Sequence, residues 1–166
     1  MAERAPPLVD TFTQTNPAFG ALCLRWISEG YQEESARRGA DLPYVSPFWA
    51  LVGLVLLTPE QVRANLPERA TAKLSGLLYE HPEWRATIAD GVRGWVAPFW
   101  DAFRLGVATR VLALVDGRLR ATGTVQSPAT ASDLALRRKA VTLGRLLAKE
   151  SGDEARSLVF GVSVDP

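Results

Sequence analysis

Residues 44–57 read YVSPFWALVGLVLL, and this stretch decides the fold. From residue 48 to residue 57 no side chain carries a charge, a hydroxyl or an amide. A helix of that length spans roughly 15 Å, about half the hydrocarbon thickness of a bilayer. The run is therefore too short to cross a membrane, and its length favours a buried element at the centre of a domain.

Flanking residues indicate that this central run is a helix. Ser46 followed by Pro47 is a helix start, because serine caps the first turn and proline at the first helical position loses no needed hydrogen bond. The glycine and the β-branched residues inside the run argue weakly for a strand. Thr58 and Gln61 have capping-box spacing, which predicts a further short helix that ends before residues 66–67, a Leu-Pro pair.

The chain before this run predicts a long amphipathic helix over residues 17–38. Asn16 is a suitable cap, Pro17 again stands at the first helical position, and Gly39 can close the end. Its apolar positions recur at spacings of three and four. They are Phe19, Leu22, Cys23, Trp26, Ile27 and Tyr31.

The second half of the chain mixes helical patterns with a hairpin. Strand-forming runs on both sides of Asp116-Gly117 predict a β-hairpin over 110–121. Pro98 either bends one helix or separates two. Ser132 is the expected cap of the last helix. The predicted helices cover residues 71–80, 83–105 and 133–149, a loop covers 122–131, and a strand covers 157–164, which could lie beside the hairpin.

These elements define a mostly α fold with a small β-hairpin or three-strand element. Residues 1–14 lack periodicity and are expected to be flexible, whereas residues 15–166 form a single helical domain. Cys23 is the single cysteine, so no intrachain disulfide can form, and the N-terminus lacks the pattern of a secretory signal. Both observations fit a cytoplasmic protein that does not associate with a membrane.

Catalytic chemistry has little support in the sequence. His81 is the single histidine and precedes a proline at a predicted helix end, where it acts as a C-terminal cap. Cys23 lies on an apolar helical face and is expected in the core. One histidine and one cysteine cannot supply a metal site made of such ligands. We therefore expect no catalytic residues, no metal and no cofactor.

Positive charge is concentrated in residues 85–150, which hold 11 Lys/Arg and 5 Asp/Glu in a chain of net charge +1. Two helices followed by a hairpin, over 83–121, would match the order of elements in a winged helix. Its second helix would be aromatic (Phe99, Trp100 and Phe103), which favours protein contact over base reading. The alternative is nucleic-acid binding through the basic segment. Candidate contacts for a partner or for nucleic acid are Arg104, Arg110, Arg118, Arg120, Arg138 and Arg145.

Four blocks of the sequence occur in a characteristic order. They are residues 16–21 (NPAFGA) with Gly30-Tyr31, residues 51–67 with Thr58-Pro59 and Arg63, residues 140–148 (AVTLGRLLA), and residues 158–162 (LVFGV). Together they resemble the middle component of three-component ABC-ATPase (ABC-3C) systems from bacterial conflict loci. Two departures from that family are Gly53, at a position where we expect proline, and a middle region without distinctive motifs.

The resemblance implies a non-enzymatic adaptor in an anti-phage or conflict system. Its partners would be an ABC ATPase of the SMC or Rad50 kind and a third component of the same system. It brings no catalytic residues with it.

Overall fold

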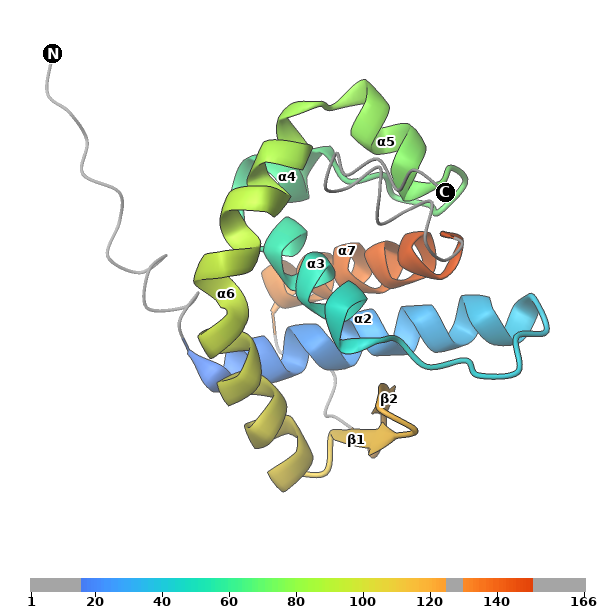
Figure 1. Cartoon of the computed structure of the whole chain (residues 1–166), viewed down its shortest axis with the longest axis vertical. Coiled ribbons are helices and arrows are strands. Elements are labelled where there is room, and N and C mark those ends of the chain that lie inside the picture. The colour runs from blue at the N-terminus through green and yellow to red at the C-terminus, as the bar shows by residue number, and fades with distance from the viewer. Residues whose placement is uncertain (1–15, 125–129, 151–166) are drawn as a thin grey trace, which may run out of the picture.

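The computed structural model describes residues 16–124 and 130–150. The described chain is mostly helical, and one two-stranded antiparallel sheet lies beside the helices (Figure 1). The elements in chain order are α2 (Pro17–Arg37), α3 (Pro47–Leu57), α4 (Glu60–Asn65), α5 (Leu74–Glu80), α6 (Glu83–Ala108), β1 (Leu112–Val115), β2 (Arg118–Ala121) and α7 (Ala131–Ala148).

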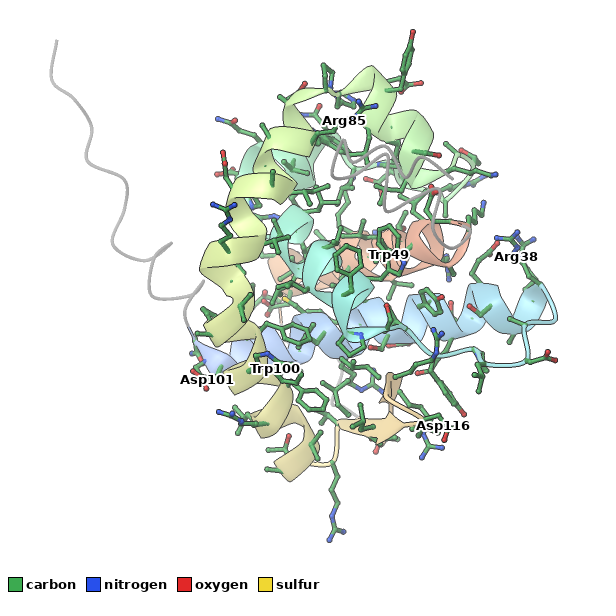
Figure 2. All side chains as sticks on the ribbon, viewed as in Figure 1. Arg38, Trp49, Arg85, Trp100, Asp101 and Asp116 are labelled. Carbon is green, nitrogen blue, oxygen red and sulfur yellow. The ribbon has the colours of Figure 1, made fainter. Side chains whose placement is uncertain are left out.

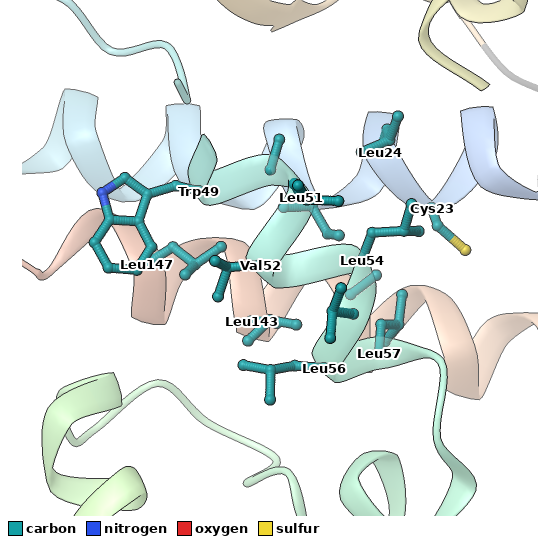
Figure 3. Close-up of a cluster of buried hydrophobic side chains, with 14 of the residues drawn as sticks. Cys23, Leu24, Trp49, Leu51, Val52, Leu54, Leu56, Leu57, Leu143 and Leu147 are labelled. Atoms are coloured by element: carbon teal, nitrogen blue, oxygen red, sulfur yellow. The ribbon is translucent and has the colours of Figure 1, made fainter. Parts of the chain in front are cut away.

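Helix α3 is the buried centre that the apolar run predicts. Every residue from Trp49 to Leu57 is buried. In Figure 3 its side chains meet Cys23 and Leu24 of α2 on one side and Leu143 and Leu147 of α7 on the other. A helix that is apolar on all faces must be covered on all faces, and α2, α6 and α7 provide that cover.

Helices α2 and α7 approach so closely that their backbones touch. A Cβ atom on Gly30 of α2 would lie 2.0 Å from the carbonyl oxygen of Val141 in α7. The reciprocal contact has the same geometry, since a Cβ on Gly144 of α7 would lie 2.0 Å from the carbonyl oxygen of Ile27 in α2. No residue other than glycine fits at either position without separating the helices.

Glycines also mark contacts of α6 and α3 with their neighbours. A Cβ on Gly20 of α2 would lie 2.7 Å from the Cβ of Ala102 in α6, and one on Gly91 of α6 would lie 2.4 Å from Val55 Cγ1 of α3. Gly53 of α3 faces both α2 and α7, and a Cβ there would lie 3.1 Å from Leu147 Cδ1. Small residues thus set the helix spacing of the core.

The expected caps of α2 and α3 are confirmed, but the expected capping box of α4 is wrong. Asn16 Oδ1 accepts a hydrogen bond from the Ala18 amide at 2.9 Å, and Ser46 Oγ accepts one from the Trp49 amide at 3.3 Å. Thr58 does not cap α4, since its hydroxyl donates to the Leu54 carbonyl oxygen at 2.7 Å and so closes the end of α3. The N-cap of α4 is Pro59, which makes no side-chain hydrogen bond.

The last helix begins two residues before the expected position, because Thr130 and not Ser132 is its cap. Thr130 Oγ1 accepts a hydrogen bond from the Asp133 amide at 3.1 Å, and the Thr130 hydroxyl donates to the Asp133 carboxylate at 2.7 Å. This pair is a reciprocal cap at capping-box spacing. The local signal is present in the sequence, at a threonine that stands just before the expected serine.

Helix α5 begins at Leu74 rather than at residue 71, because the chain before it is bound to α7. Side chains on α7 and at its C-terminal end hydrogen-bond to backbone carbonyls of the connecting segment, as Lys139 bonds to Leu66 and Lys149 bonds to Ala70. These bonds hold the connecting segment against the last helix, a long-range contact that no local sequence pattern reveals.

Pro98 lies inside one continuous helix, so the expected alternative of two separate helices is excluded. Helix α6 runs from Glu83 to Ala108 and is bowed in Figure 1, as a proline in a helix interior would cause. Its packing against α2 and α3 maintains helical geometry across the missing hydrogen bond. Because a single helix precedes the hairpin, the winged-helix resemblance of residues 83–121 is not confirmed.

The hairpin forms as predicted around Asp116 and Gly117. Both residues have positive φ values, 50° and 72°, which is the requirement of a type I′ turn. The Leu119 amide donates to the Val45 carbonyl oxygen at 2.8 Å, so the hairpin is fastened to the chain that precedes α3. The predicted strand at 157–164 and the predicted flexible segment 1–14 lie outside the described residues.

We predict that Gly144→Ala destabilises the domain strongly, because the added methyl group meets the Ile27 carbonyl oxygen in a packed core. The expected loss is about 3 kcal/mol of unfolding free energy, measured by urea denaturation. Gly94→Ala is the matched control, since Gly94 lies inside α6 and a methyl group added there would have no neighbouring atom within 4 Å. That variant should gain about 0.5–1 kcal/mol from helix propensity. Equal effects in the two variants would contradict the close packing of α2 and α7.

Candidate partner-binding surface

Cys23 and His81, the residues best suited to nucleophilic or acid–base chemistry, have structural roles in the core and at a helix end. Cys23 is 1% exposed, and burial raises the pKa of its thiol to about 12. The His81 amide closes α5 by donating to the Leu77 carbonyl oxygen at 2.8 Å, as expected of a cap. The His81 ring stacks on Trp84 at 4.5 Å, and its Nδ1 lies 3.2 Å from Glu83 Oε1. Within residues 16–124 and 130–150, no group of three or more His, Cys, Asp or Glu side chains is arranged to hold a metal ion.

Four of the predicted contact arginines lie around the end of α6 and the hairpin. Arg104 is exposed on α6 and lies 3.6 Å from Asp101, a weak surface pair. Arg110 follows the helix with a positive φ of 60° and is exposed. Arg118 donates to the Tyr44 carbonyl oxygen at 3.3 Å, and Arg120 lies over the Tyr44 ring at 5.9 Å. The last two therefore have intramolecular roles in holding the hairpin.

The other two predicted contact arginines lie on α7, away from the hairpin. Arg145 Nη2 pairs with Glu33 Oε2 of α2 at 2.7 Å. Arg138 is exposed on the same helix. The hairpin and α7 lie on either side of α2 in the view of Figure 1. The structure thus does not bring the six arginines together into one basic surface.

Carboxylates of α2 already neutralise part of the positive charge of α7. Arg137 reaches Glu29 at 2.9 Å, and Glu29 also pairs with Arg25 at 2.8 Å. Near the end of α2, Arg37 donates two hydrogen bonds to the buried Glu34. These hydrogen bonds are the main cause that lowers the pKa of the Glu34 carboxyl. These pairs fasten α2 to α7 and hold the end of α2, so part of the positive charge of α7 is paired within the chain.

A groove of about 390 Å³ lies between the first turn of α2, α4 and the start of α7. Its walls carry both signs of charge, with Glu60 and Asp133 against Arg63 and Lys139. The two cations are engaged by the protein itself. Arg63 donates to the Leu57 and Thr58 carbonyl oxygens at 3.1 and 3.0 Å, and Lys139 pairs with Glu68 at 2.7 Å. The groove therefore does not present a set of free groups that converge on a ligand.

The exposed face of α6 is the surface that sequence analysis identified only in part. Of the three aromatic residues assigned to a recognition helix, Phe99 is buried, Phe103 is half-buried and Trp100 is 42% exposed. Trp100 and Asp101 leave the helix in different directions (Figure 2). Val96 and Val107 are 42% and 40% exposed. We call Val96, Trp100, Phe103 and Val107 the α6 stripe.

The α6 stripe has a signal in the sequence that could have revealed it. Its members are separated by four, three and four residues, which places them on one helical face. The pattern did not show which of the two apolar faces of α6 would be covered by α2 and α3. Large exposed apolar side chains in a continuous row are typical of surfaces that contact another molecule.

These features describe a small helical domain whose exposed apolar row suits contact with a macromolecule. Its identity follows from comparison with known families: the chain belongs to the ABC-three component (ABC-3C) system Middle Component 3 family, whose model matches residues 10–164. No curated protein and no solved structure matches the chain. The resemblance drawn from the four sequence blocks is thereby confirmed.

The residues that carried the family resemblance have structural roles in the described chain. Asn16 caps α2, and Arg63 caps the end of α3. Gly30 and Gly144 form the contact between α2 and α7. The three blocks within the described residues therefore contribute to the scaffold, whereas the residues of the α6 stripe lie outside these blocks.

We predict that Cys23 resists thiol reagents in the native protein. At pH 8 a thiol of pKa about 12 is ionised to roughly one part in ten thousand, and its burial blocks access as well. Ellman's reagent should therefore label the chain only as fast as it unfolds, and should label one thiol per chain in 6 M guanidinium chloride. Complete labelling of the native protein within seconds would contradict the buried position.

Proposed function

We propose that this protein is the non-enzymatic adaptor of its ABC-3C system. It links an ABC ATPase of the SMC or Rad50 kind to the third component of the system, in the cytoplasm, as part of defence against phage or competing elements. The observation that carries the proposal is the family match over residues 10–164, since that family is a middle component. A middle component has partners by definition, so its surfaces must bind them.

The structure supports this role through the separation of scaffold and surface. The charged pairs that link α2 and α7, such as Arg145 with Glu33 and Arg137 with Glu29, stabilise the scaffold. The α6 stripe is exposed on a helix held by the core along its other face. A rigid helix with an apolar row is a suitable docking element, because little conformational entropy is lost when it binds. Within the described residues, no helix has both the length and the apolar character needed to cross a membrane.

Coexpression of the three components with an affinity tag on the third component tests the proposal. The tagged protein should retain the ABC ATPase when the present chain is included and should lose most of it when the present chain is omitted. That result is expected of a link between the two, whereas a simple ligand of one component would not bridge them.

Elution of the present chain alone from the three-protein coexpression would contradict the adaptor role. Duplex DNA provides a further comparison at low salt. A chain that elutes alone but binds DNA, and loses that affinity in an Arg118→Ala, Arg120→Ala variant, would favour the nucleic-acid function instead.

A further inference from the structure

The α6 stripe is an apolar row backed by the core, in which Val96, Trp100 and Val107 are exposed and Phe103 is half-buried. From Val96 to Val107 the helix advances roughly 16 Å, about three turns. Trp100 lies near the middle of the row and contacts Phe103, with ring centroids 5.5 Å apart. Tryptophan is one of the residue types enriched among those that dominate the binding energy at the centre of an interface.

Positive charge borders the stripe on its solvent side. Arg93 precedes Trp100 by seven residues, two turns along the helix, and Arg104 follows it by four, one turn along, so both lie on the same side of α6 as the tryptophan. Arg93 is exposed and has no ion pair among residues 16–124 and 130–150, and Arg104 is only weakly paired to Asp101. The border would attract carboxylates in a partner.

The shape and charge together select one kind of partner. An apolar row three turns long on a helix is complementary to the apolar row of a second helix packed along it. The adjacent arginines require acidic rather than basic residues beside that row. A nucleic acid would instead leave Trp100, Val96 and Val107 against a charged backbone.

We propose that the α6 stripe binds an acidic amphipathic helix supplied by another component of the same ABC-3C system. Trp100 is the apolar anchor of this contact, and Arg93 and Arg104 pair with Asp or Glu side chains at its edge. The contact is small, so its affinity depends on the anchor more than on its area. This inference rests on the proposed adaptor function and assigns it a surface.

Charge-insertion variants of the full chain test the proposal in pull-downs with the ABC ATPase and, separately, with the third component. Trp100→Glu should weaken binding to one of the two components by at least about tenfold and leave binding to the other unchanged. The double variant Arg93→Glu, Arg104→Glu should weaken the same interaction about fivefold, and the effect should shrink at high salt.

Matched controls make the same chemical changes elsewhere on the surface. Tyr79→Glu replaces an aromatic residue that is 82% exposed on α5, and Arg69→Glu reverses an exposed arginine outside α6. Both should bind like the wild type. Circular dichroism should show the same helix content and nearly the same Tm for all variants, and the arginine variants keep the test decisive if Trp100→Glu does not fold.

Several results would overturn the assignment. If the wild type binds both components and the folded stripe variants bind equally well, the adaptor role stands but the α6 stripe is not its surface. If the wild type binds neither component, both proposals fail. A wild-type dimer in sedimentation that becomes a monomer in Trp100→Glu would identify a second copy of this chain as the occupant. A tenfold gain in affinity on removing residues 1–14 would identify the chain's own N-terminal segment instead.

Discussion

The backbone contact between α2 and α7 is the constraint on which the rest of the structure depends. A Cβ atom on Gly30 or on Gly144 would lie 2.0 Å from a backbone carbonyl oxygen of the opposite helix. At that spacing the two helices form one surface on which α3 lies, and Gly53 lets α3 approach both of them. The apolar length of α3 is buried because α6 then covers its remaining face, with Gly91 against Val55. The fold is thus built by close approach of small residues as much as by large apolar side chains.

Elements specified by local signals could be predicted from the sequence. The caps Asn16 and Ser46 fix the starts of α2 and α3, and Asp116-Gly117 fixes the hairpin, because each depends on residues within a few positions. The predictions were less accurate where distant residues decide. The start of α5 depends on hydrogen bonds to side chains of the last helix and its end, and the continuity of α6 through Pro98 depends on packing against α2 and α3. No local pattern contains that information.

The candidate surface was likewise predictable only in part, because contacts between distant residues decide which side chains are exposed and unpaired. The candidate contact arginines come from one basic stretch of sequence, but the fold separates them, since Arg145 pairs with Glu33 and Arg118 fastens the hairpin. The aromatic face of α6 was recognised, although burial separates Phe99 from Trp100. The sequence blocks 16–21, 51–67 and 140–148, which carried the family resemblance, lie in the scaffold, and the proposed docking residues lie between them on α6.

Native-state hydrogen exchange followed by mass spectrometry tests the central claim most directly. If the contact of α2 with α7 is the foundation of the fold, amides around Gly30 and Gly144 will exchange only through global unfolding, with a free energy equal to that from urea denaturation. Amides of α5 and of the hairpin will exchange through smaller openings. Faster exchange around Gly30 and Gly144 than in α5 would contradict the account.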